Sequence, residues 1–442
     1  MNKKFIPLII ILLFSYLFGY NQNNFSITNN QEREVIKFKL VNNLILLPVT
    51  LNGKELTFLL DTGVKQSLLF NITKSDSLDL KQIKKVKIRG LGTEEQFDGL
   101  KSKNNLLRIN NVVCPNFDLL VIIDKKFDFS SRMGLDIHGI IGSELFMDFI
   151  IEVNYNKKRI IFNNPSSYKY KKCRKCETFP LTFHYKKPYI QGIVKTFDNK
   201  NYSVKLLIDS GGGDSLWLFK NSLSKYSIPP KNFKDLLGRG LNGNIFGQKS
   251  KLTSFKIGSF KFNNLIISHP DSSSTIGNNI HFVRNGLIGA ELLKRFHIIY
   301  DYPHKKITLK KNKQNFKNQF FYNKSGIELI HYGKVLVREQ KAKIVFNGNQ
   351  DENNGISDLF STFSYSFKNA YQISYIKPNS IAEKTGLQKG DLISKINGKE
   401  AYNFSLQQII QRLSDKEGKR VRIQVNRNGN FYDYKIILKE LL

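Results

Sequence analysis

The sequence contains the same short pattern twice, and this internal duplication constrains the fold more strongly than any other feature. The apolar run 56–60 ends in Asp-Thr-Gly at 61–63, and the similar run 203–208 ends in Asp-Ser-Gly at 209–211. The two aspartates are 209 − 61 = 148 positions apart. Repetition at a fixed offset indicates one structural unit that is present in two copies.

A second landmark follows each motif at nearly the same offset. The run His-Gly-Ile-Ile-Gly-Ser-Glu-Leu at 138–145 matches Asn-Gly-Leu-Ile-Gly-Ala-Glu-Leu at 285–292. Gly142 and Gly289 are therefore 289 − 142 = 147 positions apart. Because the landmarks recur in one order, we expect two homologous lobes.

These lobes span residues 31–165 and 177–312, and the basic segment 166–176 joins them. The linker contains the C-x-x-C pair Cys173 and Cys176, in a chain with 3 cysteines. So few cysteines exclude a scaffold built on disulfides. A zinc site needs more ligands than this stretch supplies, and a redox motif needs a βαβ context. We therefore interpret the pair as structural or incidental.

Each lobe is predicted to be mainly β. Short apolar runs rich in β-branched and aromatic residues are separated by turn-forming residues such as Asn52 and Gly53. Helical periodicity is brief. Glu144 and Glu291 are expected to start short helices, because an acidic side chain suits the N-terminal end of the helix dipole. The predicted strands include 44–49, 57–60, 119–123 and 149–153.

Two aspartates held together can do chemistry that one cannot. Carboxyl groups within hydrogen-bond reach share one proton, because both cannot hold full charge. The ionised oxygen can then act as general base on a bound water, while the protonated partner hydrogen-bonds a peptide carbonyl and later protonates the leaving amine. This reaction needs no cofactor and no metal. The competing interpretation is that each aspartate only caps a turn.

The residues after each aspartate are suited to holding such a pair. Gly63 and Gly211 let the backbone turn tightly, so that an amide can come close to the carboxylate. The hydroxyl groups of Thr62 and Ser210 can hydrogen-bond across the lobe junction and hold the two loops in register. The duplicated lobes then supply one aspartate each around a pseudo-twofold axis.

On these motifs, residues 31–312 resemble the pepsin/retropepsin clan of aspartic proteases, and more closely the bacterial exported retropepsin-like proteases with a C-terminal PDZ domain. The resemblance implies two acid-protease β-barrel lobes with Asp61 and Asp209 as the catalytic pair. Val64 and Gly212 depart from the small residue, often Ala or Ser, that usually follows the motif. The resemblance also assigns residues that support the catalytic loops, and by position candidates for a flap. The support residues are Thr62, Gly63, Ser210, Gly211, Gly142 and Gly289, and the flap candidates are Gly90, Gly92, Gly240 and Gly243.

The C-terminal part of the chain is similar to a bacterial PDZ domain, an α+β fold, over the run 376–398. We expect this domain to span 319–442. Ser405 and Gln408 form a capping-box pattern that predicts the start of a helix. Asn-Gly at 428–429 predicts a tight hairpin turn.

The PDZ resemblance implies that a peptide adds as a strand beside a helix, with its terminal carboxylate held by backbone N–H groups. Placing the carboxylate-binding loop beside Gly326, Ile327 and Leu329 requires a long polar insertion at about 331–369. The alternative is a module that only braces the protease lobes. The candidate peptide-binding residues are Gly326, Ile327, Leu329, Leu406 and Ile410.

The N-terminal residues 1–22 are predicted to direct the chain out of the cytoplasm. Lys3 and Lys4 precede the apolar run 5–18, which is typical of a secretory signal. No A-x-A-like cleavage site follows, so an uncleaved N-terminal anchor is the alternative. Either interpretation predicts a periplasmic or secreted protein.

The chain is strongly basic, with 69 Lys+Arg against 36 Asp+Glu and a net charge of +33. Such a charge permits binding to nucleic acid or to anionic surfaces. The lysines are scattered and no nucleic-acid motif accompanies them, so we interpret them as a solvated basic surface and expect no nucleic-acid partner.

Together these features predict a monomeric, single-chain aspartic endopeptidase with an intramolecular active site. Its expected partners are a protein or peptide substrate and a C-terminal peptide at the PDZ groove. The first alternative is a catalytically silent peptide-binding or scaffold protein that uses the cleft and the PDZ groove. A third is a binder of anionic polymers, which predicts steeply salt-dependent binding.

Overall fold

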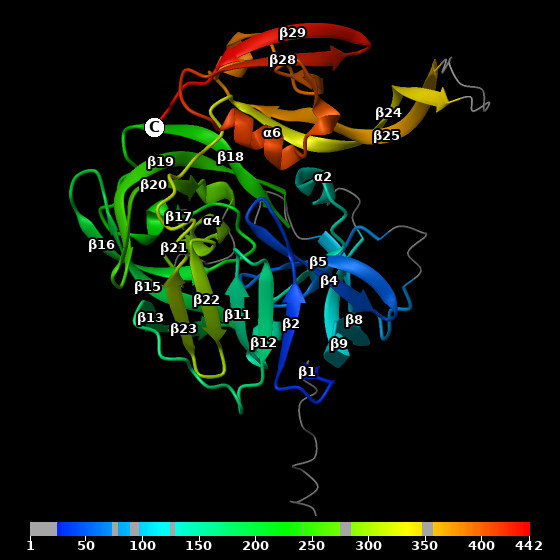
Figure 1. Ribbon diagram of the computed structural model, residues 1–442. Helices are drawn as coiled ribbons and strands as arrows, with labels where there is room; N and C mark the ends of the chain where they lie inside the picture. The colour runs from blue at the N-terminus through cyan, green and yellow to red at the C-terminus, as the bar shows by residue number, and fades with distance from the viewer. Residues whose placement is uncertain are drawn as a thin grey trace, which may run out of the picture.

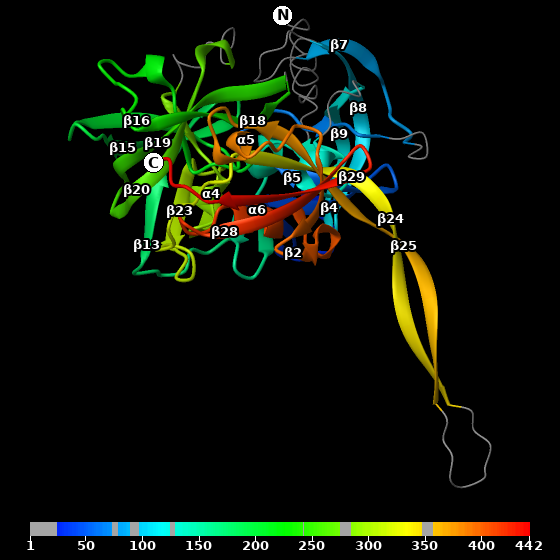
Figure 2. The same ribbon diagram turned by 90° about the horizontal axis from the view of Figure 1, so that it is seen from above.

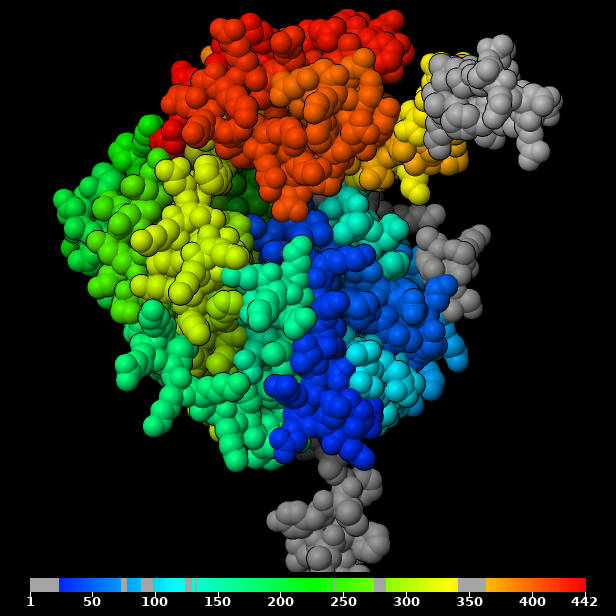
Figure 3. Space-filling model, in the orientation of Figure 1, coloured from blue at the N-terminus to red at the C-terminus, as the bar shows by residue number. Residues whose placement is uncertain are grey.

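The computed structural model describes residues 24–72, 78–88, 97–123, 129–241, 243–274, 284–346 and 357–442. They form two β lobes side by side and a C-terminal module seated across the top of both (Figures 1 and 3). The predicted signal or anchor lies outside these residues. None of the helices in the described ranges is long and apolar enough to cross a membrane.

The first lobe is built on a mixed sheet in which the strand order is β1-β9-β6-β10-β5-β4-β8-β7, with β3 paired to β4. The Asn52–Gly53 turn between β4 and β5 has positive φ at both residues, as a tight hairpin requires. The strands are β1 (Ser26–Ile27), β3 (Lys39–Val41), β4 (Leu44–Leu51), β5 (Lys54–Leu60), β6 (Leu68–Leu69), β7 (Lys84–Ile88), β8 (Phe97–Ile109), β9 (Val112–Ile122) and β10 (Gly139–Ile141).

The second lobe repeats this topology. Its order is β14-β15-β16-β21-β17-β20-β19-β18, and the equivalent path in the first lobe is β3-β4-β5-β10-β6-β9-β8-β7. The duplication seen in the sequence is therefore a duplication of strand pairing. The strands are β14 (Thr182–His184), β15 (Lys187–Lys195), β16 (Asn201–Ile208), β17 (Leu216–Leu218), β18 (Asn232–Gly240), β19 (Gly243–Ile257), β20 (Phe260–Pro270) and β21 (Gly286–Ile288).

A third sheet joins the lobes beneath the motif loops, in the order β13-β23-β22-β11-β12-β2 (Figure 1). At its centre β11 and β22 are antiparallel, and Glu152 lies opposite Ile299. These residues are 299 − 152 = 147 positions apart, so each faces its own counterpart and the pseudo-twofold axis passes between them. The strands are β2 (Arg33–Lys37), β11 (Ile150–Asn154), β12 (Arg159–Asn163), β13 (Cys176–Pro180), β22 (Phe296–Asp301) and β23 (Lys306–Lys311).

The helices of the lobes are short. The prediction that Glu144 and Glu291 start helices is confirmed, since each lies in a first turn directly after Gly142 or Gly289. Cys173 and Cys176 form a disulfide at the start of β13. The helices are α2 (Ser130–Met133), η1 (Ser143–Met147), η2 (Lys220–Ser222), η3 (Ser272–Ser274) and α4 (Ala290–Leu293).

The C-terminal module is one sheet, ordered β24-β25-β26-β28-β29, that packs against α6 around its own apolar core. The predicted capping box is confirmed, because Ser405 and Gln408 exchange side-chain and backbone hydrogen bonds. Asn428 and Gly429 form the predicted hairpin turn with positive φ at both positions. The elements are β24 (Ile327–Phe346), β25 (Ser357–Ile376), α5 (Ile381–Lys384), β26 (Leu392–Ile396), β27 (Lys399–Glu400), η4 (Ala401–Asn403), α6 (Leu406–Leu413), β28 (Arg420–Arg427) and β29 (Asn430–Ile437).

The segment 331–369, which was expected as a polar insertion, consists of strands where the structure describes it. Its described parts continue β24 and β25 into a two-stranded arm that projects away from the body (Figure 2). Leu336, Phe363, Tyr365 and Phe367 are all exposed on this arm. Phe363, Tyr365 and Phe367 alternate with polar residues along β25, and such alternation has the period of a β-strand.

A buried ion pair ties the C-terminal module to the second lobe. Lys377 directly follows β25, and its Nζ lies 3.3 Å from Oδ2 of Asp235 on β18. Both residues are nearly inaccessible to solvent. Lys249 on β19 approaches the same carboxylate at 3.8 Å, and the Lys377 ammonium also lies 4.0 Å from the ring centroid of Phe233. The β18–β19 hairpin is thus held from above by the module.

Replacing Lys377 by methionine should destabilise this contact. The change removes the nearer cation from a buried carboxylate, and the expected loss is about 2 kcal/mol in the free energy of unfolding, since Lys249 remains as a partner. Hydrogen exchange should rise in β18 and in the last residues of β25. Lys389→Met, at an exposed position of the same module, is the control. Equal stability and exchange in both variants would show that the contact does not hold the hairpin.

Candidate active site

Asp61 and Asp209 follow the last residues of β5 and β16, at the junction of the lobes. The amide of Asp61 donates to the carbonyl of Ile141 at 2.9 Å, and that of Asp209 donates to the carbonyl of Ile288 at 2.9 Å. Because β10 and β21 run parallel beside β5 and β16, they extend under both aspartates. The runs that end in Gly142 and Gly289 therefore lie beside the two motif loops.

The residues after the aspartates bind each other across the junction. The amide of Thr62 donates to Oγ of Ser210 at 3.0 Å, and the amide of Ser210 donates to Oγ1 of Thr62 at 3.0 Å. Each hydroxyl in turn donates to a carbonyl of the opposite lobe, Thr62 to Ile208 at 2.7 Å and Ser210 to Leu60 at 2.9 Å. The predicted hydrogen bonding across the junction is confirmed.

This arrangement brings each carboxyl group against the glycine of the other loop. A Cβ atom placed on Gly63 would lie 2.7 Å from Cγ of Asp209, and one placed on Gly211 would lie 2.1 Å from Oδ2 of Asp61. A carbon–carbon or carbon–oxygen contact of that length is impossible, so only glycine fits at either position. The amides of Gly63 and Gly211 also donate to Oδ1 of their own aspartates, at 2.7 and 3.1 Å.

The surroundings of Asp61 favour its protonated form. Burial raises the pKa of the Asp61 carboxyl well above its usual value, and the negative charge of Asp209 raises it further. The hydrogen bond from Gly63 and the positive charge of Lys187 act in the opposite direction. The pKa of Asp61 therefore depends on the charge of Asp209.

Gly142 and Gly289 brace the loops from below. The amide that follows each glycine donates to a carbonyl of the motif loop: Ser143 to Val64 at 2.8 Å, and Ala290 to Gly212 at 2.6 Å. Val64 and Gly212 therefore serve through their backbone carbonyls. A Cβ atom on Gly289 would lie 2.7 Å from the Gly212 oxygen, which explains why this turn has no side chain.

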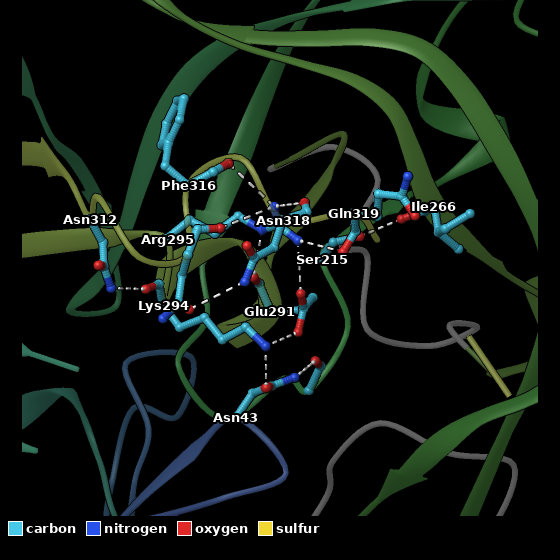
Figure 4. Close-up of polar contacts among 12 residues, drawn as sticks. Asn43, Ser215, Ile266, Glu291, Lys294, Arg295, Asn312, Phe316, Asn318 and Gln319 are labelled. Atoms are coloured by element: carbon cyan, nitrogen blue, oxygen red, sulfur yellow. Dashed lines mark hydrogen bonds and ion pairs between the residues drawn. The ribbon is translucent and has the colours of Figure 1, made fainter. Parts of the chain in front are cut away.

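Each lobe also reaches over to the other motif loop with a hairpin turn. Asn43, in the β3–β4 turn, donates through Nδ2 to the carbonyl of Gly213 at 3.3 Å. Its Oδ1 accepts from Lys294 at 2.8 Å, and Lys294 is also paired with Glu291 (Figure 4). Arg295 fixes the other oxygen of Glu291 at 3.0 Å.

The matching turn of the second lobe makes the matching contact. Tyr185 lies in the β14–β15 turn, and the ammonium of Lys65 stands 4.9 Å from the centroid of its ring. Lys65 and Gly213 are 213 − 65 = 148 positions apart, the offset of the two aspartates. Each motif loop is therefore contacted by a hairpin turn of the other lobe, through a hydrogen bond on one side and a cation–π contact on the other.

Of the four flap candidates, the structure describes Gly240 and Gly243. Gly240 ends β18 and Gly243 begins β19, so both lie at the tip of the second lobe's hairpin. Leu241 at this tip packs on an apolar cluster of the first lobe that includes Leu44 and Ile140. A flap role for this hairpin stays a prediction. Gly90 and Gly92 lie outside the described residues.

The candidate peptide-binding residues of the C-terminal module lie close together. Ile327, Leu329 and Leu406 belong to its buried core, Ile410 packs at the edge of that core, and Gly326 has a positive φ of 86° at the start of β24. Their role in peptide binding stays a prediction.

One end of the space between β24 and α6 is approached by the first lobe. A Cβ atom on Gly134, directly after α2, would lie 3.7 Å from Cβ of Leu406 and 4.0 Å from Cδ2 of His331 (Figure 1). This contact is what the bracing alternative requires.

Sequence reasoning missed Lys187 beside the aspartates and one of the two roles of Glu144. Glu144 is buried, and its Oε1 accepts from the amide of Ser67 at 2.7 Å, so it holds the end of the first motif loop as well as starting a helix. Lys187 begins β15 and its charge acts on both aspartates. No local signal marks Lys187, because its equivalence with Leu44 of the first lobe appears only in the strand register.

Other features do not add a second centre. Among the described residues, no group of three or more His, Cys, Asp or Glu side chains could hold a metal ion. A cavity of about 490 Å³ lies between the second lobe and the C-terminal segment, lined in part by Lys251, Arg295 and Glu440. None of its lining residues belongs to the motif loops.

Comparison with known families agrees with this geometry. Residues 47–145 match the family model described as aspartyl protease, and residues 372–427 match that of the PDZ domain. The chain thus carries an aspartyl protease domain in its first lobe and a PDZ domain near its C-terminus. The family match points to a peptidase.

Similarity to individual proteins is more limited. A probable CtpA-like serine protease of Staphylococcus saprophyticus is 34% identical over 68 residues, which are 15% of this chain and 14% of that protein. The serine protease Do-like HtrA of Lactobacillus helveticus is 37% identical over 73 residues, 16% of this chain and 17% of that protein. The crystal structure of an aspartic proteinase from Irpex lacteus aligns with a TM-score of 0.41 at 13% identity, over 63% of this chain and 97% of that one.

Substitution of Gly211 by alanine tests the close approach of the loops. The new Cβ would collide with the Asp61 carboxyl, and the expected loss is about 2–3 kcal/mol in the free energy of unfolding, measured by chemical denaturation. Gly238→Ala in β18 is the matched control, because a Cβ there meets nothing within 4 Å. If both variants were equally stable, the carboxyl would not lie against the opposite loop.

Proposed function

We propose that the chain is an aspartic endopeptidase that hydrolyses peptide bonds by activating a water between Asp61 and Asp209. One observation carries the proposal: hydrogen bonds between Thr62 and Ser210 fix the motif loops so that each carboxyl lies against the glycine of the other loop. The match of residues 47–145 to an aspartyl protease family supports it.

The environment of the pair suggests which aspartate acts as the general acid and which as the general base. Asp61, whose pKa is raised by burial and by Asp209, is the carboxyl that keeps the proton and hydrogen-bonds the peptide carbonyl oxygen. Asp209 is ionised and accepts a proton from water, while the water oxygen attacks the carbonyl carbon. Asp61 then protonates the leaving amine as the C–N bond breaks, and the proton that Asp209 took from water leaves the pair with one proton again.

The substrate in this proposal is a protein or peptide, and the PDZ domain is a second place for a peptide C-terminus. Both relatives named above are serine proteases by name, and this chain matches only a small part of each. Their catalytic mechanism is therefore not carried over to this chain. The N-terminal run is proposed to export the chain. The alternative of a silent peptide-binding protein would be favoured by binding without cleavage.

Asp61→Asn and Asp209→Asn should each lower kcat by at least about a thousandfold, because either change removes one member of the acid–base pair. Both variants should keep the circular dichroism spectrum and the melting temperature of the parent to within a few degrees. Cleavage is measured on a diverse peptide mixture from acidic to neutral pH, with the exposed Asp271→Asn as control. Full activity of either catalytic variant would refute the shared-proton pair.

The pH profile should respond to Lys187. Its positive charge lowers the pKa of Asp61, so Lys187→Met should raise that pKa. Activity requires the pair to hold one proton, and the alkaline limb of kcat/KM reports its loss from the free enzyme. We therefore expect this limb to move to higher pH in Lys187→Met. An unchanged or acid-shifted limb would contradict the placement of the cation beside the pair.

A further inference from the structure

The two lobes provide an internal comparison of the walls beside the aspartates. In the first lobe Leu46 on β4 pairs with Leu59 on β5, two residues before Asp61. Continuing this antiparallel register by two residues places Leu44 across from Asp61, on the same face of the sheet. Leu44 is buried in the first lobe's apolar cluster.

The same register in the second lobe gives a different residue. Tyr189 on β15 pairs with Leu207 on β16, two residues before Asp209. Two residues further, Lys187 lies across from Asp209. The position that is leucine beside one aspartate is therefore lysine beside the other.

A second pair of equivalent positions differs in the same way. The amide of Phe70 donates to the carbonyl of His138 at 2.8 Å, and the amide of Phe219 donates to the carbonyl of Asn285 at 2.8 Å. The residues just before these carbonyls, Ile137 and Arg284, are thus counterparts. Both share a wall with the equivalent phenylalanine, since Ile137 lies in one apolar cluster with Phe70.

Arg284 occupies this apolar place as a cation. It is 6% exposed, and its guanidinium carbon lies 5.4 Å from the centroid of the Phe219 ring. Its Nε has no hydrogen-bond partner within the part of the chain that the structure describes. Arg284 is buried and Lys187 is half-buried, and neither forms an ion pair with any other described residue, although a buried cation normally has one.

Lys187 and Arg284 together carry more positive charge than the aspartate pair can neutralise. The aspartate pair carries one negative charge when it shares a proton, whereas Lys187 and Arg284 carry two positive charges. Burial lowers the pKa of both cations, and the charge of Arg284 lowers that of Lys187 further. An anionic group bound between them would relieve both the desolvation and the repulsion.

We propose that the wall formed by Lys187 and Arg284 is a substrate subsite for an acidic side chain, aspartate or glutamate. The inference rests on the proposed peptidase function. In an extended peptide successive side chains point to opposite sides. The residues that flank the cleaved bond therefore face opposite lobes, and the acidic preference falls on the residue that faces the second lobe.

The test begins with the full chain and a peptide library from which the preferred cleavage sequence is read. A peptide with glutamate at the acidic position and its glutamine counterpart are then compared. Wild type should cleave the glutamate peptide with kcat/KM at least about tenfold higher, as expected for a charge-assisted hydrogen bond. Arg284→Ile and Lys187→Leu together rebuild the wall of the first lobe, and should reduce the ratio to about one.

Matched variants separate charge from folding. Arg284→Lys keeps the cation and should keep most of the preference. Lys195→Leu removes a positive charge from the far end of β15 and should leave the ratio unchanged. Cleavage with no preference for glutamate over glutamine in the wild type, or a preference that survives in the double variant, would overturn the subsite and leave the peptidase proposal intact.

A binding measurement keeps the two proposals distinguishable. The Asp61→Asn chain is titrated with the same peptide pair by calorimetry. Tighter binding of the glutamate peptide, lost when Arg284 is also changed to isoleucine, would support the subsite even if wild type cleaved no peptide and the peptidase proposal failed. Equal affinity for both peptides would overturn the subsite.

Discussion

The hydrogen bonds between Thr62 and Ser210 are the interaction on which the site depends. Each hydroxyl accepts from the opposite amide and donates to a carbonyl just before the opposite aspartate. Neither loop can shift without breaking a bond of the other, and all of these groups are shielded from water, where an unpaired polar group is costly. The close approach of the carboxyls and the raised pKa of Asp61 both follow from this constraint.

Around this centre the backbone is symmetric and the charges are not. In the shared sheet the pseudo-twofold axis passes between Glu152 and Ile299. The turns at Asn43 and Tyr185 each contact the motif loop of the other lobe. Gene duplication supplies such a frame in one step, but each copy is then free to vary its side chains. The change from Leu44 to Lys187 shows that the two walls have acquired different chemistry within one scaffold.

The repeat made the aspartates, their glycines and the two-lobe topology predictable, because these depend on local residue types at a fixed offset. Lys187 and Arg284 were not predictable in the same way. Their importance follows from strand register and burial, which a single lysine or arginine in a basic chain does not reveal. The strands of the arm are predictable from the alternation of Phe363, Tyr365 and Phe367 with polar residues, whereas their projection away from the body is not. The contact of Gly134 with Leu406 joins residues far apart in the chain, and no local pattern indicates it.

The central claim is that Asp61 and Asp209 hold one proton between them. Side-chain carbon NMR of the two carboxyls, followed across pH in the intact chain, measures this most directly. The account predicts that the Asp61 carboxyl stays protonated well above the range where exposed aspartates ionise, and that its titration moves to lower pH when Asp209 is replaced by asparagine. Two carboxyls that titrate independently in the ordinary range would contradict it.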